Sequence, residues 1–288
     1  MGVVVNTNIS SITASRILSE NRADLEKAME RLASGKRINS AADDAAGMAV
    51  AAKMRADIGS LNQSVRNTND AISLVNTYDG AAAEIESILI RMRELAVQTR
   101  NGTYEEADRT NANFEYTALK NEITRIAGVS AFNRMTVGQG SSGAAGGTGV
   151  ADTTFTFYVG SDVAKTGNSI AFAAKALDLN LAVSSGTLNS VVDTASAGQA
   201  IATLDDAITE LAANRAQAGA LINRLEHTVS NLMNVSQRLQ EAVSGIEDAD
   251  YAAESANLAR GMVLAQAGTA MLAQANQAPQ YILSLLRG

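Results

Sequence analysis

Two groups of carboxylates are the side chains best suited to chemistry in this sequence. Asp43 and Asp44 are adjacent, and Glu247, Asp248 and Asp250 form a second group. Such groups can bind a hard cation through oxygen atoms, or flank a glycosidic bond in a hydrolase. Both groups lie at predicted helix boundaries, where a carboxylate can cap the free N–H groups of a first turn. We therefore interpret them as capping residues and predict no metal site and no catalytic residue.

The composition leaves few other routes to catalysis or cofactor binding. The chain has 288 residues, no cysteine and a single histidine, His227. Zinc sites built from Cys and His, and Cys–His nucleophiles, cannot be formed from this set. The glycine-rich run at 138–149 lacks the Gly-Lys-Ser/Thr ending of a phosphate-binding loop. We predict that the protein is not an enzyme and has no cofactor.

Charge and hydropathy exclude two classes of partner. The formal net charge is −7, and the Lys and Arg residues are dispersed among more numerous acids. A nucleic-acid partner would call for a basic stripe, so none is expected. No run of 18 apolar residues occurs, so we expect no insertion into a membrane. The N-terminus lacks the basic and apolar regions of a Sec signal, so an exported chain would use another route.

Residues 88–100, ILIRMRELAVQTR, mix basic and apolar side chains. If the segment is helical, Leu89, Met92 and Ala96 share one stripe that is assigned to the core by the periodicity described next. The residues predicted to face away from that stripe are Arg91, Glu94, Leu95 and Gln98. Arginine beside apolar side chains is enriched at protein interfaces, although an exposed Leu is also ordinary surface. The residues alone leave both interpretations open.

The strongest periodicity lies in residues 204–246, which predict a long coiled-coil helix. Steps of four and three residues define a seam in which only Arg215 and Ser236 are not apolar. A 43-residue helix of this kind would be about 65 Å long. His227 falls two residues after a seam position and is expected to face solvent. The seam positions are Leu204, Ile208, Leu211, Arg215, Ala218, Ile222, Leu225, Val229, Leu232, Ser236, Leu239, Val243 and Ile246.

The N-terminal half offers a partner helix with the same periodicity. Its seam runs from residue 54 to residue 96 with one slip of phase, which changes supercoiling locally without ending a helix. The seam positions are Met54, Ile58, Leu61, Val65, Thr68, Ile72 and Val75, and after the slip Tyr78, Ala82, Ile85, Leu89, Met92 and Ala96. A shorter helix is predicted to follow, with Tyr116, Leu119, Ile123 and Ile126 on one face.

Both ends of the chain are also predicted to be helical. Leu18, Leu25 and Leu32 recur every seven residues near the N-terminus. Near the C-terminus a seam of smaller residues is predicted at Leu258, Met262, Ala265, Thr269 and Leu272. Such faces bury little apolar area, which offsets the loss of chain entropy poorly. We expect these ends to need partners in order to fold.

The middle of the chain has a different pattern. Residues 138–149 contain six glycines and are predicted to form a flexible link. Apolar residues then alternate with polar ones at 155–159 and again at 177–183, and this period of two predicts strands. Residues 138–199 are therefore predicted to be a small β-containing insert between two helical arms.

Residues 32–50, LASGKRINSAADDAAGMAV, predict a helix–turn–helix corner. Gly35 suits the positive φ of a helix C-terminus, and Ser40 with Asp43 has the spacing of an N-cap. The same stretch resembles the N-terminal signature of bacterial flagellin, L-x-S-G-x-R-I-N-S-A-x-D-D-A-A-G. The site residues of this helix-corner signature are Gly35, Arg37, Asn39, Ser40, Asp43 and Asp44.

Further stretches resemble the same family in the same order. They are NTN at 6–8, RNTNDAISL at 66–74, IEDADYAAE at 246–254 and LAQANQAPQYILSLLRG at 272–288. The resemblance covers roughly residues 1–137 and 200–288. Arg134 departs from it, because flagellins usually have Gly at that position.

The resemblance implies a fold and a domain layout. The fold is mainly α, a long antiparallel coiled-coil or helical bundle formed by the N- and C-terminal arms, with the small β-containing insert between them. Residues 1–42 with 253–288 would form an inner terminal coiled-coil domain. Residues 43–137 with 200–252 would form a helical rod domain, and residues 138–199 would form a variable surface insert.

The function implied by the resemblance is that of a structural subunit. The chain would polymerise into the extracellular flagellar filament for swimming motility, after export by the flagellar type III apparatus. Its partners would be other copies of itself, flagellar cap and junction proteins, and an export chaperone. The alternatives are a hook–filament junction protein or surface adhesin with similar helical ends, and a hydrolase within the insert. The hydrolase is disfavoured because residues 138–199 contain no His, Cys or Glu.

The resemblance also implies a role for the mixed segment. In flagellins the pattern R-x-R-E-L-A-V-Q, matched here by residues 91–98, packs against neighbouring subunits. In many flagellins the same surface of the monomer is recognised by the vertebrate Toll-like receptor 5, together with a Glu that aligns with Glu115. We define the contact patch as Arg91, Glu94, Leu95, Gln98 and Glu115.

Overall fold

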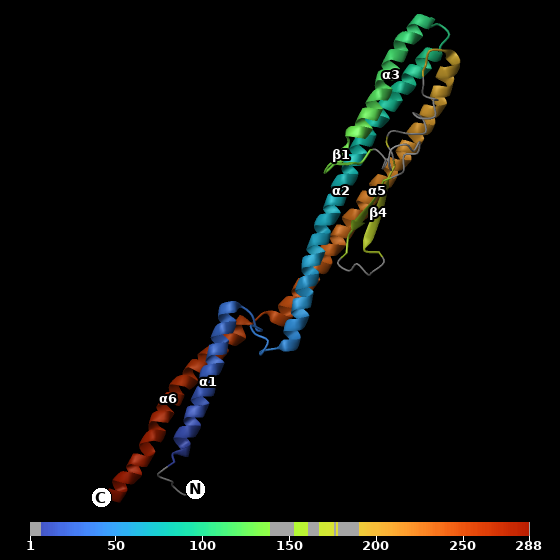
Figure 1. Ribbon diagram of the computed structural model, residues 1–288. Coiled ribbons are helices and arrows are strands. Elements are labelled where there is room, and N and C mark those ends of the chain that lie inside the picture. The colour runs from blue at the N-terminus through green and yellow to red at the C-terminus, as the bar shows by residue number, and fades with distance from the viewer. Residues whose placement is uncertain (1–6, 139–152, 161–166, 176, 178–189, 288) are drawn as a thin grey trace. The chain divides into compact units, whose positions relative to one another are not determined.

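The computed structural model describes residues 7–138, 153–160, 167–175, 177 and 190–287 (Figure 1). Its helices are α1 (Ile9–Ser34), α2 (Ala45–Arg100), α3 (Glu106–Val129), α5 (Thr194–Glu247) and α6 (Tyr251–Arg287). Its strands are β1 (Ala131–Phe132), β2 (Met135–Thr136), β3 (Thr153–Tyr158) and β4 (Ser169–Ala174). The mainly helical fold with a small β component is as predicted.

The chain divides into two compact units. The terminal unit contains Met1–Ile58 and Gln237–Gly288, and the central unit contains Gly59–Ser236. None of the described helices has a stretch long and apolar enough to cross a membrane.

In the terminal unit, α1 and α6 pack side by side as an antiparallel pair (Figure 1). The side-chain amide of Asn8 donates to the carbonyl of Ala275 at 2.7 Å at one end of the pair, and Arg31 bonds to Glu254 at the other. On α1 the least exposed positions are Leu18 and Ala28, with Leu25 partly buried between them. Leu32 is partly buried as well, so the predicted seven-residue repeat of α1 is confirmed.

The predicted seam of α6 is out of phase at two positions. Met262 is 54% exposed and Thr269 is also exposed, whereas Gly261 and Gly268 lie on the buried side. A Cβ atom on Gly268 would come within 3.1 Å of Leu18 Cδ1, and one on Gly261 within 3.4 Å of Leu25 Cβ. Two leucines of α1 thus lie opposite glycines of α6, with the tighter approach at Gly268, and a pattern of apolar side chains does not include glycine.

The core of the central unit is built from α2, α3 and α5. On α5 the predicted seam is confirmed, because its residues are buried or partly buried from Leu204 to Leu232, and His227 is exposed as predicted. On α2 the second half of the predicted seam is almost fully buried, from Tyr78 to Ala96. On α3 the predicted face is confirmed: Tyr116 and Ile123 are buried, and Leu119 and Ile126 pack against them.

A β-hairpin of the insert packs onto this helical core. β3 and β4 pair antiparallel, with Phe155 opposite Phe172, and one face of β4 is buried. The ring of Phe172 meets the ring of Tyr78 on α2 edge-on, with 5.4 Å between centroids. The predicted strand at 155–159 is confirmed for residues 155–158, and its partner at 169–174 was not predicted. Of the predicted strand at 177–183, only Leu177 lies within the described residues, and it is buried outside any strand.

Candidate functional site: a contact patch and a helix corner

The contact patch lies on the neighbouring helices α2 and α3 of the central unit. The guanidinium of Arg91 donates to Glu115 at 2.9 Å and to Glu94 at 3.1 Å. Gln98 donates to the hydroxyl of Tyr104 at 2.9 Å. The hydrogen bonds to Glu115 and then to Glu94 raise the pKa of Arg91, so it stays charged. Arg91, Glu94, Gln98 and Glu115 are all exposed; Glu94 and Glu115 are brought together around Arg91, whereas Gln98 bonds to Tyr104.

Leu95, the fifth residue of the patch, does not face outward as predicted. It is only 3% exposed and belongs to the same buried cluster as Ile123 and Ala127 of α3. The prediction treated α2 as having one partner helix, α5. Because α3 also packs on α2, a second stripe of α2 is buried, and Leu95 lies on it.

The exposed apolar side chains near the patch are different residues. Ile90 is 46% exposed and Val97 is 49% exposed, and both share a stripe of α2 with Glu94. Phe114, next to Glu115 on α3, is 69% exposed. Sequence reasoning missed these three residues because it assigned the apolar part of the patch to Leu95. The patch therefore combines a charged centre with exposed aliphatic and aromatic groups, a mixture typical of protein interfaces.

The helix corner at residues 35–44 ends one helix and starts the next. Gly35 has φ +71°, and its N–H donates to the carbonyl of Arg31 at 2.9 Å, so its role as the C-cap of α1 is confirmed. The carboxylate of Asp43 accepts hydrogen bonds from the backbone N–H of Ser40 at 2.9 Å, from its hydroxyl at 3.1 Å, and from the N–H of Asn39 at 3.2 Å. The backbone bond from Ser40, followed by its hydroxyl bond, lowers the pKa of Asp43.

The predicted N-cap at Ser40 is wrong. Residues 40–43 form a turn, and α2 begins at Ala45. The capping carboxylate is that of Asp44, which accepts the N–H of Gly47 at 2.9 Å. The spacing of Ser40 and Asp43 is realised as a closed turn, because the carboxylate folds back onto the N–H of Ser40.

The segment between α1 and α2 meets the segment between α5 and α6 at this corner. Lys36 and Asp248 form a β-bridge, and the N–H of Arg37 donates to the carbonyl of Glu247 at 2.6 Å. The side chain of Arg37 donates to the carbonyl of Ile246 at 2.5 Å. The arginine and backbone of the corner signature thus hold the end of α5.

The second carboxylate group divides between capping and ion pairing. Asp250 accepts the N–H groups of Ala252 at 2.9 Å and Ala253 at 3.2 Å, so the capping interpretation is confirmed for this residue. Glu247 does not cap a helix: it is 5% exposed and makes two contacts of 3.0 Å with Arg55. Among the described residues, no three acidic or histidine side chains are placed to hold a metal ion.

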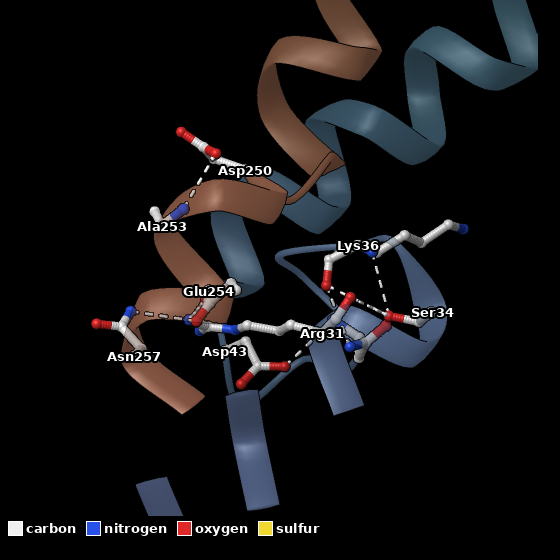
Figure 2. A network of polar contacts seen from close by, with 9 residues as sticks. Arg31, Ser34, Lys36, Asp43, Asp250, Ala253, Glu254 and Asn257 are labelled. Atoms are coloured by element: carbon white, nitrogen blue, oxygen red, sulfur yellow. Dashed lines mark hydrogen bonds and ion pairs between the residues drawn. The ribbon is translucent and has the colours of Figure 1, made fainter. Parts of the chain in front are cut away.

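Figure 2 shows a second ion pair, which joins α1 to α6. Arg31 donates to Glu254 at 2.9 Å, and the amide of Asn257 donates to the other carboxylate oxygen at 3.2 Å. Glu254 is 8% exposed, and these bonds, with that from Arg31 the larger, lower its pKa. The charge is therefore retained in a nearly buried position.

The α1–α6 pair leaves many large apolar side chains exposed. A groove of about 480 Å³ lies between the two helices and is lined mainly by apolar side chains, among them Ile9, Ile17, Leu264 and Met271. Within residues 9–34 and 251–277 of these helices, the exposed large apolar residues are Ile9, Ile12, Ile17, Met29, Tyr251, Met262, Val263, Leu264 and Met271. A terminal unit with this surface is suited to pack against other protein.

Comparison with known proteins gives matches along almost the whole chain. Residues 5–142 match the bacterial flagellin N-terminal helical region, and residues 201–286 match the bacterial flagellin C-terminal helical region. A flagellin of Halalkalibacterium halodurans is 41% identical over 99% of this chain and 100% of its own. The flagellar filament 33 kDa core protein of Treponema phagedenis is 38% identical, with the same coverage of both chains. A crystal structure of Bacillus cereus flagellin matches 58% of this chain and 88% of that chain, with 34% identity and a TM-score of 0.49.

Proposed function

This chain belongs to the bacterial flagellin family, and we propose that it assembles by folding its ends against those of neighbouring copies. It is a structural subunit that polymerises into the flagellar filament for swimming motility. The family is a structural, non-enzymatic one.

The observation that carries the assembly proposal is the exposed apolar surface of α1 and α6. The seam between these helices contains two glycines and several alanines, so their own contact buries little area. At roughly 25 cal/mol per Å² of apolar area, such a contact offsets the entropy of ordering two helices poorly. Association would bury Ile9, Ile12 and Val263, which are each more than 60% exposed in the single chain. Folding of the ends is then coupled to polymerisation.

The contact patch is proposed as a second association surface. Its four exposed residues, together with Ile90, Val97 and Phe114, would pack against a neighbouring subunit in the filament. On a free monomer the same surface would be available to Toll-like receptor 5. Support comes from the exposure of these side chains and from the ion pairs that orient Arg91.

We also propose the domain layout that the sequence predicts. The ends, residues 1–42 with 253–288, would line the inner part of the filament, and residues 43–137 with 200–252 would form the rod. Residues 138–199 would face outward. The chain would leave the cell through the flagellar type III apparatus with the help of an export chaperone, and would add to the filament beneath a cap protein, next to the junction proteins at its base.

Truncation tests the assembly proposal. Deleting residues 253–288 removes almost all of α6 but leaves the central unit whole. We expect no filaments from this chain when filament seeds are added, as judged by electron microscopy, because α1 has lost the helix it packs on. The full-length chain, run in parallel, should give long uniform tubes.

The central unit supplies the control for folding of the truncated chain. Its thermal unfolding, followed by circular dichroism, should match that of the same unit in the full-length chain. Normal filaments grown from a correctly folded truncated chain would show that the ends are dispensable, and would overturn the proposal.

A further inference from the structure

Arg215 is the one charged residue in the buried seam of α5. It lies between Leu211 and Ala218, which are both fully buried. Its side chain is 34% exposed, so a third of it reaches solvent while the rest lies between helices. An arginine at a seam position costs packing energy compared with leucine, so its presence calls for a role other than stability.

Two carboxylates of α2 hold this arginine. Its Nε atom donates to Asp79 at 2.9 Å, and an Nη atom donates to Glu86. Asp79 and Glu86 are seven residues apart, one heptad along α2, and Ala82 between them is fully buried. The guanidinium therefore has one carboxylate on each side along the helix axis.

The apolar positions of the seam fix the axial position of the two helices only weakly. α2 and α5 run antiparallel, because Arg215 pairs with Asp79 while Asp205 pairs with Arg93. Leucines recur on α5 at Leu204, Leu211, Leu225 and Leu232, with spacings of seven or fourteen residues. A shift by one heptad, about 10 Å along the axis, would therefore place apolar residues opposite apolar residues again.

Arg215 distinguishes the native register from both neighbouring ones. A shift in one direction would place it between Ile72 and Asp79, so one of its two carboxylates would be lost. A shift in the other direction would place it between Glu86 and Arg93, which would set two guanidinium groups side by side. Only the native register offers an acid on each side.

We propose that Arg215 is a positioning residue that sets the axial register between α2 and α5. The register determines which part of the outer surface of α5 lies beside α2, for example Asp205 beside Arg93. It therefore defines the composite surface of the rod that a neighbouring molecule meets. This role concerns folding within one chain and is independent of the proposed association surfaces.

Distances between spin labels can test the register directly. The chain has no cysteine, so cysteines introduced at the exposed positions Asn76 of α2 and Ala202 of α5 take up label only there. In the native register these positions are about 20 residues apart along the axis, or about 30 Å. A one-heptad shift would change that separation to about 20 or 40 Å. Pulsed electron paramagnetic resonance distinguishes these distances well.

The full-length chain should give one distance, and its Arg215→Leu variant should give a second population shifted by about 10 Å. The matched control is Arg125→Leu, which removes the same charge from an exposed ion pair within α3, outside the seam between α2 and α5. This control should keep the single native distance, because an exposed pair contributes little.

A second variant guards against misfolding of Arg215→Leu. Replacing both acids, with Asp79→Asn and Glu86→Gln, keeps side-chain size but removes the charges that bracket the arginine. This variant should also show the shifted population while retaining its helical circular dichroism. The proposal is overturned if both variants keep only the native distance, or if Arg125→Leu shows the same second population as Arg215→Leu.

Discussion

Glu254 shows how a single residue makes the terminal unit depend on pH. Its carboxylate is nearly buried between α1 and α6 and takes hydrogen bonds from Arg31 and Asn257. These bonds lower its pKa below the ordinary value of 4.5. A carboxylate with a lowered folded pKa adds stability above its unfolded pKa, and that stability is lost as the pH falls through the folded pKa. The terminal unit should therefore loosen in acid.

We predict that Glu254→Gln lowers the free energy of unfolding of the terminal unit at pH 7 by about 1 kcal/mol. The reason is that Arg31 keeps its charge but loses the anion that it contacts. In acid strong enough to protonate Glu254, the variant and the original chain should unfold alike. Thermal unfolding followed by circular dichroism at both pH values measures this difference.

The control for this prediction is Glu20→Gln in the same unit. Glu20 pairs with Arg16 on α1, but its side chain is 59% exposed, so solvent screens the pair. This variant should change little at either pH. An equal loss at pH 7 from both variants would mean that the burial of Glu254 has no special effect.

Individual residues were predictable from the sequence where local backbone geometry decides their role. Gly35 is such a case, because a helix that ends in a left-handed turn favours glycine whatever packs around it. The roles of Leu95 and Ser40 were not predictable in this way. The first depends on α3 covering α2, and the second on a carboxylate turning back onto the N–H of Ser40. Both are tertiary or turn interactions that periodicity does not contain.

At the scale of elements, α6 shows a balance between helix propensity and close packing. Gly261 and Gly268 lie on its buried side, where α1 approaches closely. Glycine inside a helix costs about 1 kcal/mol relative to alanine. The two sites differ in the space that a methyl group would find, so they form a matched pair.

We predict that Gly261→Ala raises the free energy of unfolding of the terminal unit by up to about 1 kcal/mol. A Cβ atom there would lie 3.4 Å from Leu25 Cβ, which is close to an ordinary contact. Gly268→Ala should gain less, because its Cβ atom would lie 3.1 Å from Leu18 Cδ1 and that side chain must move. Parallel thermal unfolding of both variants tests the order, and a larger gain at Gly268 would contradict it.

Long elements were more predictable than short ones. The heptad pattern of α5 extends over six repeats, so an occasional exception such as Arg215 does not obscure it. In α6 the signal is weaker, since glycines and exposed apolar residues occupy neighbouring positions, and the predicted phase was wrong at Met262 and Thr269. The strand β4 was not predicted, because its buried Ile170, Phe172 and Ala174 alternate with residues that include the apolar Ala171 and Ala173.

At the scale of the whole molecule, exposed apolar side chains occur in two kinds of surroundings. Along α1 and α6 of the terminal unit they line a groove between two helices, whereas in the contact patch of the central unit they lie around a charged centre. The first kind of surface is suited to permanent burial in an assembly, and the second tolerates water when the chain is alone. This difference fits a subunit that exists both as a monomer and within a filament.

We predict that the double variant Arg91→Ala, Gln98→Ala lowers signalling of the monomer through Toll-like receptor 5 by roughly tenfold, because truncating an interface arginine typically has an effect of this order. Both side chains are exposed, so the thermal stability of the central unit should change by less than about 0.5 kcal/mol. Leu95→Ala is unsuitable for this test, since emptying a buried position costs about 2–5 kcal/mol and disturbs the fold. A receptor reporter assay on purified monomer measures the effect.

The matched control removes a different exposed arginine from the same bundle. Arg125 lies on α3 and pairs with Glu122, with its side chain 59% exposed, and it is outside the contact patch. Arg125→Ala changes the net charge by the same amount as Arg91→Ala, so it separates loss of the patch from loss of positive charge. Signalling should be unchanged in this control. Equal signalling from the double variant and the original chain would remove the receptor from the partners of the patch, while a loss in both variants would attribute the effect to net charge.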